Sequence, residues 1–208
     1  AVFSAHVSFL FLTLGGADAY LNPIEQFCII MGALIHDLDH PGTNNDFEVK
    51  RSTSLAKLYD NDSVLERHAI NIGLTMCLEN PHLDWLKSFQ DEKDREYVKK
   101  YISESVLATD PARHAIIVKE ALSFVGSGPP YFNKNDPQHR IFIGRLILHS
   151  ADITNPLHSS FEVASDWAIR VVTEFDKQAK REKELQLPVT SFMDGLDSQV
   201  SIATTQIA

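Results

Sequence analysis

Apolar residues recur at spacings of three and four along most of this 208-residue chain, and no segment keeps the strict alternation of apolar and polar positions that marks a surface strand. The pattern therefore predicts an all-α fold. We expect helices over residues 2–13, 22–38, 46–58, 63–79, 91–108, 111–125, 137–151, 160–184 and 198–207.

Helix start signals support this division of the chain. Three amide or acidic side chains stand directly before a proline, which suits the first helical position because its ring fixes φ and no N–H donor is needed there. These pairs are Asn22-Pro23, Asp110-Pro111 and Asp136-Pro137. Ser63 with Glu66, and Ser159 with Glu162, have the spacing of capping boxes.

Composition limits the class of protein and its partners. The hydrophobic set makes up 44% of the residues, enough for the core of one large domain. A net charge of −9 and the absence of a dense Lys/Arg cluster argue against nucleic acid as a partner. Cys28 and Cys77 lie in apolar stretches and favour a reducing compartment over a disulfide framework. The apolar opening, residues 1–16, is too short to span a bilayer.

Candidate chemistry is densest in "IHDLDHPGTNN", residues 35–45. His36 and His40 are four residues apart and share one helix face, and Asp37 can reach the same point from the side. Imidazole and carboxylate together suit zinc, and further carboxylate and water positions suit Mg²⁺ or Mn²⁺. The alternative is a helix end capped by His36, with Asp37 and Asp39 solvated.

A second apolar helix ends with similar chemistry in "LILHSADITNP", residues 146–156. His149 and Asp152 are three apart on one face. A carboxylate at the end of a buried helix is costly unless it is paired or ligated, and a metal shared with the first segment would satisfy both. The alternative is an ordinary helix-terminal Asp that leads into a Thr-Asn-Pro turn.

Together these segments resemble the catalytic domain of class I cyclic nucleotide phosphodiesterases. The family signature H-D-x-x-H-x-G-x-x-N is matched at His36, Asp37, His40, Gly42 and Asn45. "VLERH", "VLATD" and "HSADITNP" follow in the family's order, so the resemblance runs through essentially the whole chain. It implies a compact multi-helix HD-type catalytic domain, of which residues 1–208 form a single partial copy truncated at both ends.

The resemblance also implies two divalent metals, Zn²⁺ and a second ion that is Mg²⁺ or Mn²⁺. His36 and Asp152 would be zinc ligands, and Asp37 would bridge zinc to the second metal. The residues implied to hold metal-bound water are His40, Glu66, His68 and Asp110, and His40 is the candidate catalytic residue among them. Glu66 and Asp110 also fit as helix-start residues, so both interpretations stay open.

The chain departs from the family at its beginning. The family's general acid is the first His of an H-N-x-x-H block, whose second His is a zinc ligand, and the usual interval places that second His just before Ala1. His6 is the only histidine before His36, and it lies too close to His36 for this role. We therefore expect a trimmed piece of an active enzyme, with residues 1–208 alone inactive or severely impaired.

The resemblance implies a purine pocket as well. Gln206, in "SIATTQIA", is the candidate for holding the purine edge, and Gln199 is its rival. Val171 and Phe175 match the apolar side of the pocket, although an apolar pair four apart also fits a helix core. Asn155 matches a pocket position and is equally ordinary before a proline; "TNP" leans toward adenine.

The leading hypothesis is hydrolysis of cAMP or cGMP, with a slight lean to cAMP, by a hydroxide held between the two metals. A cyclic-nucleotide-binding regulatory module and a broader HD-type phosphohydrolase are the alternatives; an H-N-x-x-H block encoded upstream would favour the enzyme. The expected partners are the cyclic nucleotide and regulatory domains elsewhere in the protein, with no nucleic acid and no membrane span within this segment. We expect a cytoplasmic location, or the cytoplasmic face of a larger membrane-linked protein.

Overall fold

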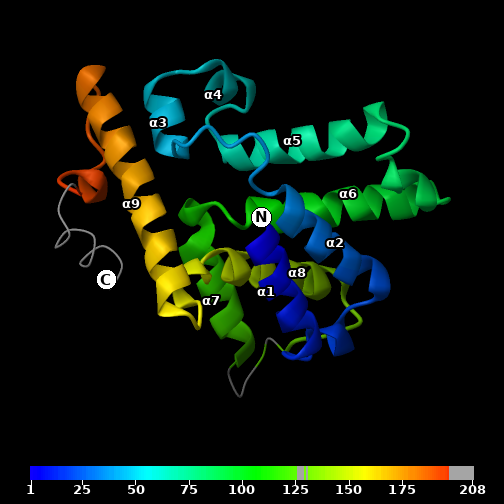
Figure 1. Cartoon of the computed structure of the whole chain (residues 1–208). Helices are drawn as coiled ribbons and strands as arrows, with labels where there is room; N and C mark the ends of the chain where they lie inside the picture. The colour runs from blue at the N-terminus through cyan, green and yellow to red at the C-terminus, as the bar shows by residue number, and fades with distance from the viewer. Residues whose placement is uncertain (126–128, 130, 197–208) are drawn as a thin grey trace. The chain divides into compact units, whose positions relative to one another are not determined.

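The computed structural model describes residues 1–125, 129 and 131–196, without the side chains of Cys77, Leu78 and Asn155. All regular elements among these residues are helices, so the predicted all-α fold is confirmed (Figure 1). The predicted helix over 198–207 lies outside the described residues. None of the helices in the described part of the chain is long and apolar enough to cross a membrane.

The chain folds into two compact units. The first unit consists of Ala1–Asp39 and Glu66–Ile153, and the second of His40–Leu65 and the described residues from Thr154 onward. The prediction that the whole chain is one catalytic domain concerns how these units fit together, and it stays a prediction.

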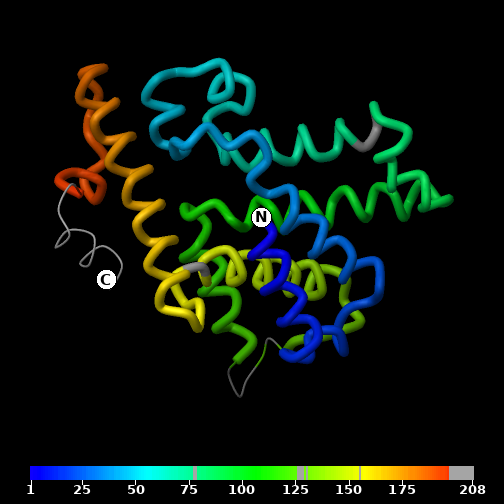
Figure 2. Tube along the Cα trace, viewed as in Figure 1, coloured from blue at the N-terminus to red at the C-terminus, as the bar shows by residue number. Residues whose placement is uncertain are grey.

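The first unit carries most of the helices. Its elements are α1 (Val2–Thr13), η1 (Ala17–Tyr20), α2 (Pro23–Ile35), α5 (Val64–Glu79) from Glu66 onward, η2 (Trp85–Ser88), α6 (Glu92–Leu107), η3 (Pro111–Arg113), α7 (His114–Val125) and α8 (Pro137–Asp152). The second unit contains α3 (Asn45–Lys50), α4 (Ser54–Leu58), η4 (Asn155–Leu157), α9 (Phe161–Glu184) and η5 (Ser191–Met193). Figure 2 follows the trace of α9, the longest of these helices.

Local backbone geometry explains where the predicted boundaries were wrong. The helix expected over 46–58 is two short helices, because Ser52 adopts a φ of 49° in the left-handed region and ends the first of them. The helix expected over 22–38 ends at Ile35 and continues as a turn to Asp39, where φ is 56°. The cap of α9 is Ser160 rather than Ser159: its hydroxyl accepts a hydrogen bond from the N–H of Val163.

Helix α2 packs against α1, α6 and α8 within the first unit. Gly32 permits this close approach, since a Cβ added there would lie 3.3 Å from Leu148 on α8 and 3.7 Å from Val106 on α6. Gly144 does the same between α6 and α8, where a Cβ would meet the Tyr101 ring at 2.5 Å. The ends of α2 and α8 are therefore set by a tightly packed three-helix core.

A buried carboxylate anchors the beginning of α2. Glu25 is fully buried and completes a capping box with Asn22, as the Asn-Pro start predicted. It also accepts hydrogen bonds from the Tyr97 hydroxyl on α6 and from Nε of Arg140 on α8, at 2.8 Å for the latter. Because every partner is charged or polar, the buried charge is compensated and ties three helices together.

Candidate metal centre

His36 directly follows α2, and the helix fixes its ring. The His36 N–H donates to the Gly32 carbonyl at 2.9 Å, and Nδ1 lies 2.8 Å from the Ala33 carbonyl oxygen. A carbonyl oxygen only accepts, so Nδ1 carries the proton in this bond. Only 4% of His36 is exposed. The ring orientation is thus set before any ligand binds, and Nε2 is the nitrogen that faces the site.

Two carboxylates meet Nε2 of His36. Oδ2 of Asp37 and Oδ1 of Asp152, the last residue of α8, each lie 3.0 Å from it. The three side chains offer ligand atoms within 4.8 Å of one another. The structure therefore brings together the three predicted metal ligands, although Asp152 lies 116 residues from His36 in the chain.

The two carboxylates change the protonation of His36. Burial lowers the pKa of the imidazole, but hydrogen bonds to Asp152 and Asp37, and the charges of both, outweigh burial and raise the pKa to about 10. In the metal-free chain a proton thus supplies the positive charge that the two carboxylates attract. A divalent cation would supply that charge with His36 neutral, so the donor set fits a metal of this kind.

This protonation predicts a pH-dependent stability of the metal-free chain. The pKa of His36 is raised from its ordinary 6.5 to about 10, so its contribution to stability is complete below pH 6.5 and is lost as the pH rises through 10. We expect the melting temperature, measured with chelator present, to fall over this range, and to fall less in Asp152→Asn. His6→Gln is the matched control, since His6 is exposed, and it should keep the slope. Equal slopes in Asp152→Asn and the unmodified chain would contradict the pairing.

Glu66 and Asp110 are both buried acids of the first unit. Glu66 is 8% exposed and lies in the first turn of α5. Asp110 is 6% exposed and accepts a hydrogen bond from the Ala112 N–H at 2.9 Å, which confirms the predicted Asp-Pro helix start, although the helix begins as the 3₁₀ turn η3. The role of Glu66 and Asp110 in holding metal-bound water stays a prediction.

His68 and His40 have different surroundings. Nε2 of His68 lies 2.9 Å from Oδ2 of Asp39 in the first unit, so Asp39 forms an ion pair when His68 is protonated. His40 belongs to the second unit and is exposed; its Nδ1 accepts the N–H of Gly42 at 3.2 Å. The role of either histidine toward metal-bound water stays a prediction.

The predicted nucleotide residues lie mostly in the second unit. Val171 and Phe175 are half-buried on α9, and Phe175 packs edge-on against Phe192 with ring centroids 5.5 Å apart. Phe175 also contacts the apolar cluster formed by Val172, Ala179, Met193 and Leu196. Gln206 and Gln199 lie outside the described residues, as does the side chain of Asn155.

The sequence reasoning missed the role of a histidine pair that supports the end of α8. His149 is buried; its Nδ1 donates to the Ala108 carbonyl at 2.7 Å, and its Nε2 lies 2.8 Å from Nδ1 of His114. Both ring nitrogens of His149 therefore have partners in the protein. Among the described residues, the group that could hold a metal consists of His36, Asp37 and Asp152 and does not include His149. No spacing in the sequence signals His114, because its partner lies 35 residues away.

Comparison with known proteins decides the family. Residues 1–208 match the family described as 3′5′-cyclic nucleotide phosphodiesterase. The chain belongs to this family. A cGMP-specific 3′,5′-cGMP phosphodiesterase 3 from Dictyostelium discoideum is 32% identical over 96% of this chain and 41% of its own length. The high affinity cAMP-specific and IBMX-insensitive 3′,5′-cyclic phosphodiesterase 8A from Mus musculus is 29% identical over 88% of this chain and 24% of its own length.

Solved phosphodiesterase structures share the fold. The phosphodiesterase domain of the RhoPDE fusion protein from the choanoflagellate Salpingoeca rosetta matches with a TM-score of 0.88 and 29% identity, over 98% of this chain and 62% of that one. A structure of LmjPDEB1 in complex with IBMX matches equally well, with a TM-score of 0.88. The chain thus spans about three fifths of the solved chains and less than half of the two curated relatives named above.

Proposed function

We propose that this protein hydrolyses a 3′,5′-cyclic nucleotide to the nucleoside 5′-monophosphate at a metal centre built on His36, Asp37 and Asp152. One observation carries the proposal: ligand atoms from two helix ends, far apart in the chain, converge within 4.8 Å. Membership of the phosphodiesterase family supplies the reaction class.

Two divalent metals fit the donors. His36 and Asp152 offer an imidazole nitrogen and a carboxylate oxygen, ligands that suit zinc. The Asp37 side chain is 51% exposed, so it is open to solvent on one side and can share its second oxygen with Mg²⁺ or Mn²⁺. Asp37 is therefore the candidate bridging carboxylate.

When bound, such metals lower the pKa of a water molecule and neutralise phosphate charge. The chain's own residues provide the preorganisation: the Ala33 carbonyl fixes the proton of His36 on Nδ1, and the packing of α2 against α8 sets Asp152 opposite Nε2. Hydrolysis then adds the oxygen of water to phosphorus and breaks the bond from phosphorus to the ribose 3′ oxygen, which takes up a proton.

Buried acids extend the site. In the proposal Glu66 and Asp110 accept hydrogen bonds from water beside the metals, and His40 and His68 contribute further polar atoms. Each of the two acids is less than a tenth exposed. A carboxylate offers acceptor oxygens to the O–H groups of metal-bound water, and this donor chemistry supports the proposed role of both acids.

The substrate is cAMP or cGMP, with a slight lean to cAMP. The lean comes from "TNP" at residues 154–156, whereas the similar proteins include both a cGMP-specific and a cAMP-specific enzyme. In the proposal the nucleotide is contacted by Asn155, Val171, Phe175 and Gln206. Regulatory domains lie elsewhere in the protein. The protein works in the cytoplasm, or on the cytoplasmic face of a membrane as part of a larger membrane-linked protein.

The test is turnover of cAMP and cGMP by the protein expressed from the complete open reading frame that encodes residues 1–208. We expect 5′-AMP or 5′-GMP, identified by chromatography against the 3′-monophosphate isomers, and a higher kcat/KM for cAMP. A preference for cGMP would overturn the lean to cAMP and leave the reaction intact. Metal-loaded, folded protein that binds both nucleotides and hydrolyses neither would overturn the proposed function in favour of a binding module.

A further inference from the structure

The signature loop that follows His40 is held by side chains at every position from Gly42 to Asn45. The Gly42 N–H donates to Nδ1 of His40, and the Thr43 hydroxyl donates to the buried Glu48 carboxylate at 2.6 Å. Asn45 accepts the N–H of Leu65 through Oδ1 at 2.9 Å. The conformation of this loop therefore depends on groups outside it.

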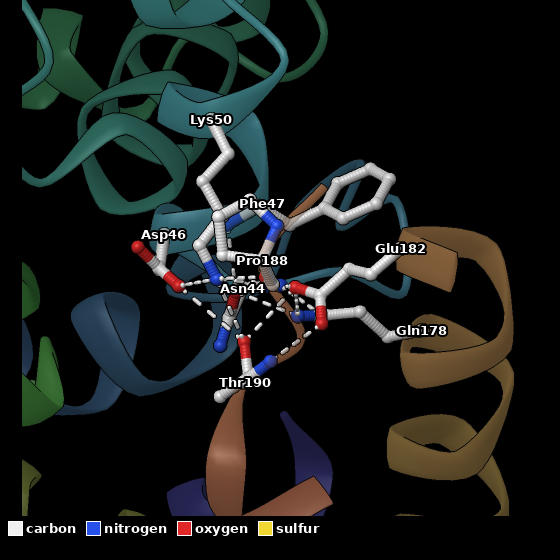
Figure 3. Close-up of polar contacts among 8 residues, drawn as sticks. All are labelled: Asn44, Asp46, Phe47, Lys50, Gln178, Glu182, Pro188 and Thr190. Atoms are coloured by element: carbon white, nitrogen blue, oxygen red, sulfur yellow. Dashed lines mark hydrogen bonds and ion pairs between the residues drawn. The ribbon is translucent and has the colours of Figure 1, made fainter. Parts of the chain in front are cut away.

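Gln178 on α9 makes the longest-range of these contacts. Its Oε1 accepts the backbone N–H of Asn44 at 2.9 Å, and its Nε2 donates to Oδ1 of Asn44 at 2.9 Å. Gln178 is 3% exposed, and it pairs with a residue 134 positions away (Figure 3). Oδ1 of Asn44 also caps α3 by accepting the Phe47 N–H. One buried amide thus fixes both the backbone and the side chain of Asn44.

A buried carboxylate holds Gln178 in turn. Nε2 of Gln178 donates to Oε1 of Glu182 at 3.2 Å, and Glu182 is fully buried. The N–H and hydroxyl of Thr190 donate to Glu182 at 2.7 and 2.9 Å, and the Lys50 ammonium lies 3.5 Å away. Burial alone would raise the pKa of Glu182, but these hydrogen bonds and the charge of Lys50 hold it below its ordinary value. Because an ionised carboxylate only accepts hydrogen bonds, it favours the amide orientation in which Nε2 of Gln178 faces Glu182 and Oε1 faces the Asn44 N–H (Figure 3).

We propose that Gln178 is a positioning residue for His40, which it orients through the Asn44 and Gly42 segments of the signature loop. Glu182 accepts a hydrogen bond from Gln178, and Gln178 in turn accepts the N–H of Asn44. Gly42 lies two residues before Asn44 in the backbone, and its N–H donates to Nδ1 of His40. Because that N–H donates, Nδ1 of His40 is the acceptor nitrogen and Nε2 carries the proton. The inference rests on the proposed function in one respect: a role for His40 in hydrolysis is assumed when an effect of Gln178 on the rate is expected.

The experiment compares two variants of the folded protein. Gln178→Met keeps the side-chain volume but loses every hydrogen bond of the amide. Lys180→Met is the control, since Lys180 is an exposed residue of α9 that pairs with Asp176 at 2.6 Å and takes no part in the contacts of Gln178 and Glu182 described above. We expect the Gly42 amide to exchange with solvent at least about tenfold faster in Gln178→Met and at the unmodified rate in Lys180→Met.

The ring ¹⁵N shifts of His40, assigned with a His40→Gln sample, should move toward those of free imidazole in Gln178→Met and stay unchanged in Lys180→Met. In the protein from the complete open reading frame, Gln178→Met should lower kcat about tenfold at unchanged KM. If Gln178→Met does not fold, Asn44→Ala removes the loop side of the same pair and should give both spectroscopic changes.

Unchanged Gly42 exchange and His40 shifts in a folded Gln178→Met protein would overturn the inference. Equal changes in both variants would also overturn it, because they would show a loss of general stability. If no protein, including the unmodified one, hydrolyses cyclic nucleotide, the proposed function fails alone, and the exchange rates still decide whether Gln178 positions His40.

Discussion

Asp152→Asn should lower kcat/KM for cyclic nucleotide hydrolysis by at least about 100-fold, since even residues that only orient metal ligands contribute about 10- to 100-fold. Asparagine keeps the size of the side chain and can still accept a hydrogen bond, but it removes the charge that faces Nε2 of His36 at 3.0 Å. The measurement is initial rates with cAMP and cGMP in the protein from the complete open reading frame.

The control for this substitution is Asp194→Asn. Asp194 is an exposed acid that pairs with Lys183 at 2.6 Å, so its neutralisation should leave rates within about twofold of the unmodified protein. Circular dichroism should show the same helix content in both variants. A folded Asp152→Asn protein with near-normal rates would remove Asp152 from the metal centre.

Removal of divalent metals should abolish hydrolysis, with a loss of at least about 100-fold, because neutral water is a poor nucleophile without a cation to lower its pKa. After chelation the protein should stay folded: the proton on His36 then supplies the positive charge beside Asp37 and Asp152. Helix content and rate are measured on the same chelated sample.

Re-addition of zinc with Mg²⁺ or Mn²⁺ should restore the rate, and rebinding should release the His36 proton, since a metal-bound imidazole is neutral. Full activity in chelated protein with no metal by elemental analysis would contradict a metal-dependent reaction. Recovery with Mg²⁺ alone, in metal-stripped protein, would contradict the assignment of zinc to His36 and Asp152.

Helix positions were largely predictable because apolar periodicity and capping are local properties. The expected start at Asn22-Pro23 and the spans of α1 and α5 agree with the structure to within a residue. The break between α3 and α4 was not predictable from periodicity, since it depends on the left-handed backbone at Ser52. Such a conformation is rare for a residue other than glycine and leaves no pattern in the sequence.

The convergence of His36, Asp37 and Asp152 was foreseeable because two buried helices each end in costly polar groups. Buried polar side chains need a hydrogen-bond partner or a bound ion, and one metal shared by the two helix ends would supply this to both. The polar contacts of Asn44 were not foreseeable. Gln178 is one glutamine on an amphipathic helix, and only the fold brings it to Asn44. Its contact with Asn44 depends on tertiary distance, which periodicity does not encode, whereas Glu182 lies four residues along the same helix.

Anomalous X-ray scattering at the zinc edge, from crystals of the zinc-loaded protein, tests directly whether His36 and Asp152 bind zinc. We expect one zinc peak about 2.0–2.2 Å from Nε2 of His36 and from a carboxylate oxygen of Asp152. A zinc peak at another place in the protein, with no peak beside His36 and Asp152 at saturating zinc, would contradict the assignment of these residues to the metal centre.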